Sequence, residues 1–201
     1  MPSFKKDEIT LEDKEKIFGK IRNVFLNSHV HIFEVEHGKN VLKYVLELNP
    51  KAALELQIAA LAHDIDRGYE REKRPTREDF PNDYDAYKAV HAKRSAEIIV
   101  KLLEEVGFLQ KSFINRVSYL VANHEVGGDQ DANDLRDADS LAFIKDSMGP
   151  SGFMSISTKQ QTKDKLDWMF FRMSEKNKEV VRPFYEDCKN KIEEYYTVKQ
   201  I

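Results

Sequence analysis

The chain has 201 residues, a length that suits one domain with a substantial hydrophobic core. Apolar residues make up 41% and charged residues 33%, as in soluble globular proteins. The formal net charge of −3 gives no reason to expect non-specific nucleic-acid binding, although a metal site can still attract an anionic substrate locally. One cysteine, a charged start and the lack of a long apolar run predict a cytoplasmic protein without disulfide framework, signal peptide or membrane span.

Glycine (8) and proline (6) are scarce, which favours long helices, and the apolar periodicity predicts these in order. Thr10 and Asp13 have the spacing of a capping box before a first helix that reaches about residue 26. A second helix begins near residue 34 and carries His37 on its apolar face. Asn49 and Pro50 are typical of a helix start, and they predict a third, central helix that is apolar on most sides and ends near residue 63.

Residues 67–83 are rich in charge and predict a long surface loop, and loops of that length usually have a role, such as covering a site. A fourth helix starts near residue 84 and ends at Gly107, a fifth reaches His124, and a sixth carries Asp139. Two amphipathic helices follow at about 158–197, and they either cover the core or mediate self-association. We therefore predict one all-α domain over residues 1–201, with a core at about 30–147 and a C-terminal helical extension.

A histidine and an aspartate stand side by side where the apolar third helix gives way to a polar segment. Imidazole and carboxylate together are ligands for divalent metals and are costly to bury without such a partner. Four further groups of these types occur at helix ends or on apolar helix faces. The hypothesis is that six side chains converge on one site: His37, His63, Asp64, His91, His124 and Asp139. Asp64 is central in this order and is expected to bridge two ions.

The order of these residues resembles the HD-domain superfamily of metal-dependent phosphohydrolases, whose motif is a histidine, a His-Asp doublet and a later aspartate. The matching residues are His37, the doublet His63-Asp64 and Asp139. The segment Ala138-Asp139-Ser140-Leu141 is similar to the A-D-x-L of that family. The residues that resemble the two extra histidines of its binuclear branch are His91 and His124. The resemblance covers about residues 30–145.

This resemblance implies an HD-domain-like helical bundle around two divalent transition metal ions, of Fe, Mn, Co, Ni or Zn. It also implies hydrolysis of a nucleotide or related small phosphate ester by metal-activated water. Asp64 and Asp66 are the candidate catalytic carboxylates, and Arg67, Lys93 and Arg94 are candidate substrate contacts. The expected partner is a small phosphorylated molecule, not a nucleic-acid polymer or a membrane, and self-association stays open.

Several alternatives stay open beside this interpretation. A single metal ion can use four of the six ligands, with His91 and His124 as phosphate contacts or hydrogen-bonded core residues. Asp66 can be a solvated loop carboxylate, and Glu125 can orient a metal ligand. The same six-residue set occurs in mixed-valent di-iron oxygenases similar to inositol oxygenase, and the fold can also serve as a non-catalytic ligand-binding module. His29 and His31 continue no helical stripe and are expected to be structural or exposed.

Overall fold

The structure is a computed structural model that describes residues 10–27, 32–69 and 74–198. Within these ranges the chain forms α-helices, two short 3₁₀ helices and one π-helical turn, with no strand, so the all-α prediction is confirmed. The elements are α1 (Leu11–Asn27), α2 (Ile32–Leu48), α3 (Leu54–Ala62), η1 (Ile65–Gly68), η3 (Arg77–Asp79), α4 (Tyr84–Glu105), α5 (Lys111–Ala122), α6 (Gln130–Ala142), η4 (Phe143–Ser147), α7 (Phe153–Ile156), α8 (Lys159–Phe171) and α9 (Glu175–Val198). His29, His31 and residues 70–73 of the expected loop lie outside the described residues.

The helix ends follow local capping chemistry in most places. Thr10 and Asp13 cap α1 as expected, because the Asp13 backbone N–H donates to Thr10 Oγ1 at 3.3 Å. The prediction that Asn49 and Pro50 start the third helix is wrong, since α3 begins only at residue 54. Asn49 instead stabilises a turn, where its Oδ1 accepts from the Lys51 backbone N–H at 3.2 Å.

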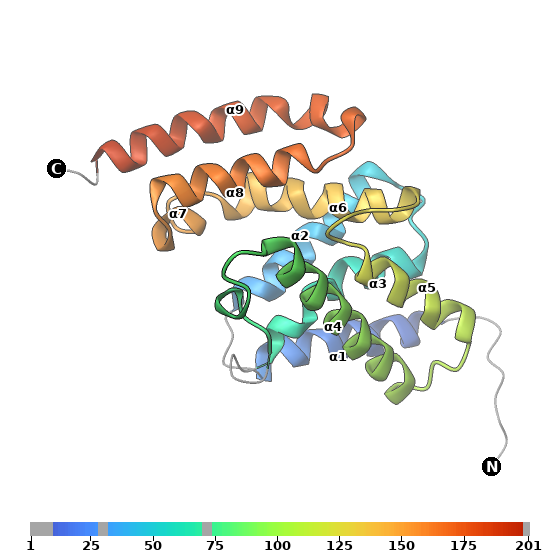
Figure 1. Ribbon diagram of the computed structural model, residues 1–201. Helices are drawn as coiled ribbons and strands as arrows, with labels where there is room; N and C mark the ends of the chain where they lie inside the picture. Colours follow the sequence, from blue (N-terminus) through green and yellow to red (C-terminus); the bar gives the residue numbers. More distant parts are fainter. Residues whose placement is uncertain (1–9, 28–31, 70–73, 199–201) are drawn as a thin grey trace, which may run out of the picture.

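The helices are stacked so that the C-terminal pair lies at one side of the molecule and α1 and α4 lie at the other (Figure 1). From the C-terminal side of the stack to the other, each helix packs on the next: α9 on α8, α8 on α6, α6 on α2, α2 on α3, α3 on α5 and α5 on α4. The C-terminal extension is therefore packed on the core through α6 and η4. This confirms that it covers part of the core, and the question of self-association stays open.

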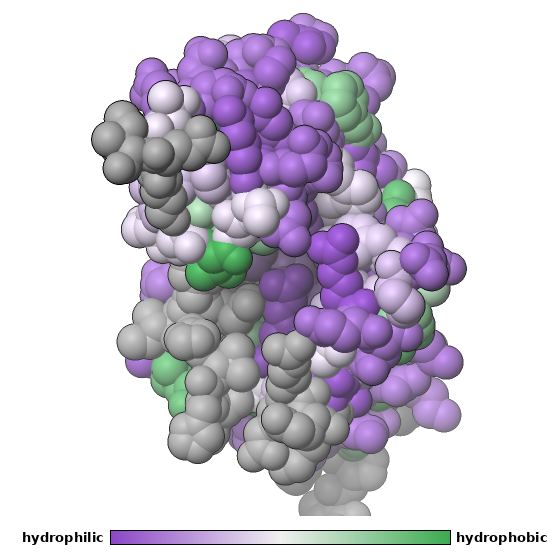
Figure 2. Space-filling view, turned by 60° about the vertical axis from the view of Figure 1, so that its left-hand side comes forward, coloured by the Kyte–Doolittle hydropathy of each residue, from purple (hydrophilic) through white to green (hydrophobic). Residues whose placement is uncertain are grey.

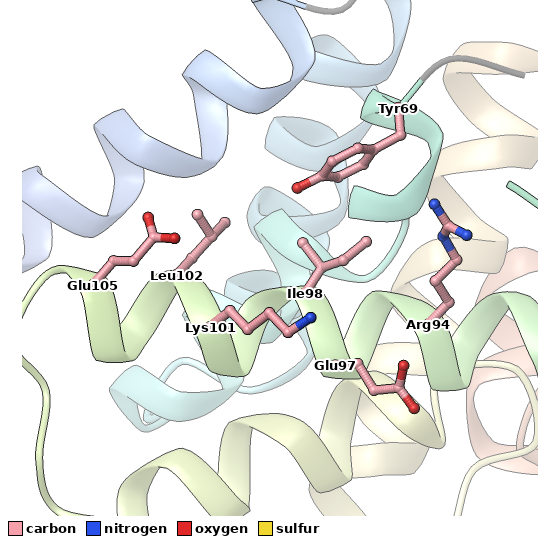
Figure 3. A pocket seen from close by; sticks show the side chains of 7 residues that line it. All are labelled: Tyr69, Arg94, Glu97, Ile98, Lys101, Leu102 and Glu105. Atoms are coloured by element: carbon pink, nitrogen blue, oxygen red, sulfur yellow. The ribbon is translucent and has the colours of Figure 1, made fainter. Parts of the chain in front are cut away.

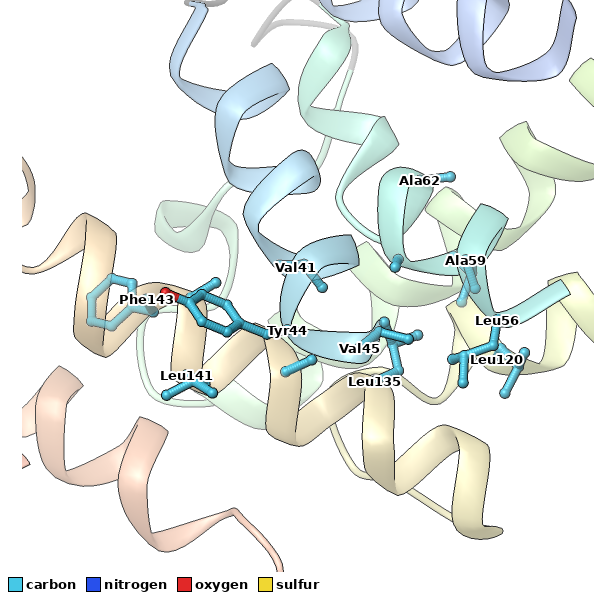
Figure 4. Close-up of a cluster of buried hydrophobic side chains, with 14 of the residues drawn as sticks. Val41, Tyr44, Val45, Leu56, Ala59, Ala62, Leu120, Leu135, Leu141 and Phe143 are labelled. Atoms are coloured by element: carbon cyan, nitrogen blue, oxygen red, sulfur yellow. The ribbon is translucent and has the colours of Figure 1, made fainter. Parts of the chain in front are cut away.

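The centre of the stack is α3, which is buried on nearly all sides as its composition predicts. Leu56 and Ala59 of this helix belong to one cluster of buried apolar side chains (Figure 4), together with Val45 of α2, Leu120 of α5 and Leu135 of α6. Burial of such side chains is the main source of stability in a helical stack, at about 1.5–3 kcal/mol for each large aliphatic group. Because α3 lies at the centre, the polar residues that follow it also lie inside the protein.

A glycine brings α2 close to α3 near the candidate site. A Cβ atom at Gly38 would lie 3.1 Å from the carbonyl oxygen of Leu61, so any larger residue would press against the α3 backbone. Gly38 is the neighbour of His37, and Leu61 is two residues before His63. The close approach leaves the His37 and His63 rings with their centroids 5.2 Å apart.

The described helices include none that is long and apolar enough to cross a membrane. The face shown in Figure 2 is mainly hydrophilic and has a recess among hydrophilic side chains.

Candidate metal centre

Two histidines of the site share one local geometry, because each lies in the turn that follows a helix. His63 comes after α3 and His124 after α5, both in a helical turn. Nδ1 of His63 donates to the carbonyl of Ala60 at 2.9 Å, and Nδ1 of His124 donates to that of Val121 at 2.7 Å. In the neutral ring, each of these bonds holds the proton on Nδ1 and leaves the inward-facing Nε2 with a lone pair for a metal ion. Both Nε2 atoms are buried, and neither has a hydrogen-bond partner in the part of the chain that the structure describes.

The first cluster contains His37 of α2, His63 and Asp139 of α6, and one donor atom from each lies within 4.8 Å of the others. Nε2 of His37 is 3.0 Å from Asp139 Oδ1, and Nε2 of His63 is 3.6 Å from the same oxygen. All three residues are buried. Two imidazoles and one carboxylate at this spacing form a suitable donor set for a divalent transition metal.

The second cluster contains Asp64, His91 of α4, His124 and Glu125, whose donor atoms also lie within 4.8 Å of one another. Nε2 of His91 is 2.7 Å from Asp64 Oδ1, and Nε2 of His124 is 3.7 Å from that oxygen. Glu125 Oε1 lies 3.2 Å from Nε2 of His124. The second cluster therefore includes Glu125, for which the sequence predicted only a role in orienting a metal ligand.

Asp64 connects the two clusters. Its Oδ1 atom faces His91 and His124, while its Oδ2 atom lies 3.7 Å from Nε2 of His63 in the first cluster. The rings of His63 and His124 are neighbours, with centroids 5.1 Å apart. One carboxylate thus offers an oxygen to each cluster, which is the arrangement expected of a bridging ligand. The structure brings all six predicted ligands together.

Asp66 is buried behind His91 and is only 1% exposed, so the alternative of a solvated loop carboxylate is wrong. Its Oδ1 atom lies 2.6 Å from Nδ1 of His91, and its backbone N–H donates to Ser95 Oγ at 3.3 Å. The two ring nitrogens of His91 therefore face Asp66 on one side and Asp64 on the other. Asp66 orients the imidazole and keeps its Nε2 directed at the second cluster.

Each carboxylate of the clusters has a cationic side chain beside it. Arg67 Nε lies 3.1 Å from Asp64 Oδ2, Lys88 pairs with Glu125, and Arg172 pairs with Asp139. A second nitrogen of Arg172 donates to Glu125 Oε2 at 2.5 Å, and its Nε donates to Ser140 Oγ at 2.8 Å. Arg172 directly follows α8, so the C-terminal extension contributes a side chain to the site. The pairing compensates the desolvation of the buried carboxylates.

These cations determine the charge of the site in the metal-free protein. Burial by itself would raise the pKa of each carboxyl, but Arg67 holds the pKa of Asp64 well below its ordinary value. Lys88 does the same for the pKa of Glu125, and Arg172 for the pKa of Asp139. The three carboxylates are therefore ionised at neutral pH and able to bind a metal.

The histidines differ in charge. Burial lowers the pKa of His124, which is therefore neutral at pH 7. Burial also acts to lower the pKa of His63, but Asp64 and Asp139 outweigh it and raise this pKa to about 9. The pKa of His91 is raised as well, because Asp64 and Asp66 outweigh burial. A metal must displace a proton from these two imidazoles, so metal binding is expected to release protons.

Of the predicted substrate contacts, only Arg67 lies at the clusters, with a side chain that is 29% exposed. Lys93 is exposed on α4. Arg94 lines a separate surface pocket of about 350 Å³, where its guanidinium lies 6.0 Å from the centroid of the Tyr69 ring (Figure 3). The remaining residues that line this pocket are Glu97, Ile98, Lys101, Leu102 and Glu105. Substrate binding by Lys93 and Arg94 stays a prediction.

Sequence reasoning missed Lys88 and Arg172, and it gave Glu125 only a supporting role. Lys88 had a detectable signal, because it stands three residues before His91 and shares its helix face. Glu125 lies in the turn after α5, where adjacent side chains do not diverge as they do on a regular helix. Arg172 is far in sequence from both of its carboxylates, and no local pattern indicated the contact.

The chain matches the family described as "Domain of unknown function (DUF4202)" over residues 19–194, and it therefore belongs to this family. The match extends through α8 and most of α9, so it includes the helix end that supplies Arg172. No curated protein and no solved structure gave a significant match. The two buried His, Asp and Glu clusters are compatible with an HD-like domain.

The residues present fit a metal centre on their own chemistry. Among the described residues, Nε2 of His63 and Nε2 of His124 are buried nitrogens without hydrogen-bond partners, and a buried polar atom without a partner is costly. A lone pair on such a nitrogen is satisfied by a metal ion. Four imidazoles with carboxylates and no thiolate suit the transition metals and leave their identity open.

Proposed function

We propose that this protein is a metal-dependent phosphohydrolase of the HD-domain type that acts on a nucleotide or a related small phosphate compound. The observation that carries the proposal is the position of Asp64, whose two oxygens face two adjacent clusters of imidazoles and carboxylates. A purely structural pair would not need four histidines around it. The order of the six ligands along the chain, which resembles the HD motif, supports the same proposal.

In this account His37, His63 and Asp139 would hold one ion, His91 and His124 would hold the other, and Asp64 would be a ligand of both. Divalent cations at these positions lower the pKa of water and neutralise charge on a phosphoryl group. The protein's own residues orient the ligands and exclude bulk water. Asp66 fixes the ring of His91, and Arg172 restrains the carboxylates of both Asp139 and Glu125.

Arg67 is the first candidate for contact with the phosphate. Its guanidinium lies beside Asp64, and its side chain is 29% exposed. The Tyr87 ring stacks on His91 with a centroid distance of 6.2 Å and is partly exposed as well. Arginine suits this position because its fork of donors matches phosphate oxygens.

The proposal is tested by assaying metal-loaded protein on a panel of phosphate mono-, di- and triesters, nucleotides and phosphoanhydrides. We expect hydrolysis of at least one class, and its loss in Asp64→Ala. Asp164→Ala is the matched control, because Asp164 is an exposed carboxylate on α8 that pairs only locally with Gln160. If no compound is hydrolysed and Asp64→Ala behaves like the control, the proposal is wrong.

The same assay separates the alternatives. A phosphohydrolase remains active without oxygen and with redox-inert zinc, whereas a mixed-valent di-iron oxygenase requires iron and O₂. A non-catalytic module binds a phosphorylated ligand without converting it.

A further inference from the structure

Three cationic side chains surround the chain's single tryptophan beside the second metal cluster. Nζ of Lys165 lies 4.4 Å from the Trp168 ring centroid, Nζ of Lys88 lies 5.3 Å from it, and the Arg172 guanidinium lies 4.4 Å from it. We call these four residues the Trp168 cluster. The faces of an indole attract cations, but the three cations also repel one another at these distances.

The carboxylates of the neighbourhood do not balance this charge. Lys88 and Arg172 share Glu125, and the second carboxylate of Arg172 is Asp139, a member of the first metal cluster. Among the described residues, Lys165 has no carboxylate within ion-pair distance, and its Nζ has only the Tyr84 hydroxyl oxygen, 3.5 Å away. A protonated Lys165 therefore gives the Trp168 cluster a local excess of positive charge, and metal ions in the two clusters would increase it further.

The excess acts on Lys165 in particular. Burial lowers the pKa of Lys165 well below its ordinary value, and repulsion by Lys88 and Arg172 lowers it further. If the side chain at position 165 only filled space, a methionine would do so without this electrostatic cost. An anion that binds beside these side chains would relieve this repulsion.

The cluster is partly exposed and lies next to the proposed reaction centre. Tyr84, Lys165 and Trp168 are each partly exposed, while Lys88 and Arg172 contact Glu125 of the second metal cluster. The Tyr84 ring packs on Trp168 at a centroid distance of 5.6 Å and forms one wall. An anion held by Lys165 would therefore lie beside the second metal cluster.

We propose that the Trp168 cluster binds a second anionic group of the substrate, so that the substrate carries at least two phosphate or carboxylate groups. This inference rests on the proposed function, since the first group is the one at the metal centre. Lys165 supplies free donors, since the Tyr84 hydroxyl accepts from only one of the three N–H groups of its ammonium, and Arg172 and Lys88 add charge. Nucleoside diphosphates and bisphosphorylated small molecules belong to this class, and simple phosphate monoesters do not.

The test compares the binding of pyrophosphate and inorganic phosphate to the metal-loaded, full-length protein by isothermal calorimetry. We expect Lys165→Met to raise the pyrophosphate dissociation constant by about tenfold or more, as the loss of a charge-assisted hydrogen bond does. The effect on inorganic phosphate, which has one phosphoryl group for the metal centre, is expected to stay within about threefold. Lys163→Met is the matched control, because Lys163 lies on the same helix but pairs with Glu193 of α9.

Trp168 provides a second readout, because it is the only tryptophan and its fluorescence reports on its surroundings. Pyrophosphate should change this fluorescence in the wild type and change it much less in Lys165→Met. Equal pyrophosphate affinity in Lys165→Met and Lys163→Met, or an unchanged fluorescence in the wild type, would overturn the inference. Lys165→Gln repeats the test if the methionine variant does not fold.

The outcomes also separate this inference from the proposed function. If no compound of the panel is hydrolysed but Lys165→Met still weakens pyrophosphate binding, the anion site stands and the phosphohydrolase proposal fails. If hydrolysis is found and Lys165→Met leaves the KM for substrates with two anionic groups unchanged, the phosphohydrolase stands and the anion site fails.

Discussion

Replacing Arg172 by methionine tests whether the C-terminal extension belongs to the metal centre. The Arg172 side chain is 8% exposed and donates hydrogen bonds to Asp139, Glu125 and Ser140. Methionine has a similar length but no charge, so two buried carboxylates lose a partner in Arg172→Met. Removal of one partner of a buried ion pair costs about 3–5 kcal/mol, because the remaining charge is left uncompensated.

That cost corresponds to a fall in the melting temperature of roughly 6–20 °C for a domain of this size. The fall in melting temperature should be largest in chelator-treated protein and smaller when metal ions neutralise the same carboxylates. The assay is calorimetric unfolding with and without metal. Arg182→Met is the matched control, because Arg182 pairs with Glu179 on the exposed side of α9, and its loss should change stability by less than about 0.5 kcal/mol. Equal losses in the two variants would refute the assignment of Arg172 to the site.

Two further predictions concern the ligands. Asp66→Asn should weaken metal binding by about tenfold to a hundredfold and leave the fold intact, because His91 loses the carboxylate that orients it. Competition with a chelator dye measures the metal affinity. An unchanged affinity would contradict the role of Asp66. In metal-free protein, His63 stabilises the fold as a cation, since its pKa is about 9 in the folded state against 6.5 for an ordinary histidine. The wild type should therefore exceed His63→Gln in free energy of unfolding by the full amount below pH 6.5, and this difference should decline by up to about 3 kcal/mol as the pH rises through 9. Urea unfolding at several pH values measures the difference. A difference that grows with pH would be inconsistent with a cationic His63.

The sequence was most informative where local periodicity sets the structure. The stripes that predict the helices also place His37 and His91 on buried faces, and both are buried. The end of the apolar run at His63 locates the site, because the polar doublet His63-Asp64 directly follows a central helix and is therefore buried. The order of the six candidate ligands was therefore enough to predict that they meet.

The sequence was least informative where distant segments meet. Arg172 reaches Glu125 and Asp139 only because α8 packs on α6, and no periodicity encodes that contact. The Asn49 and Pro50 pair was misleading because a side-chain bond to the Lys51 N–H stabilises a turn before the helix begins. Lys93 and Arg94 are close to His91 in sequence, but Lys93 is exposed and Arg94 lines another pocket.

The most direct test of the central claim is the metal content of the protein purified from its own host, measured by elemental mass spectrometry against protein concentration. The geometry of Asp64 between two clusters predicts two equivalents of transition metal per chain. Asp64→Ala should lower this number, because it removes the ligand that both ions share. A content of one equivalent would contradict the two-ion account, and a wild type that binds no transition metal would contradict the metal centre itself.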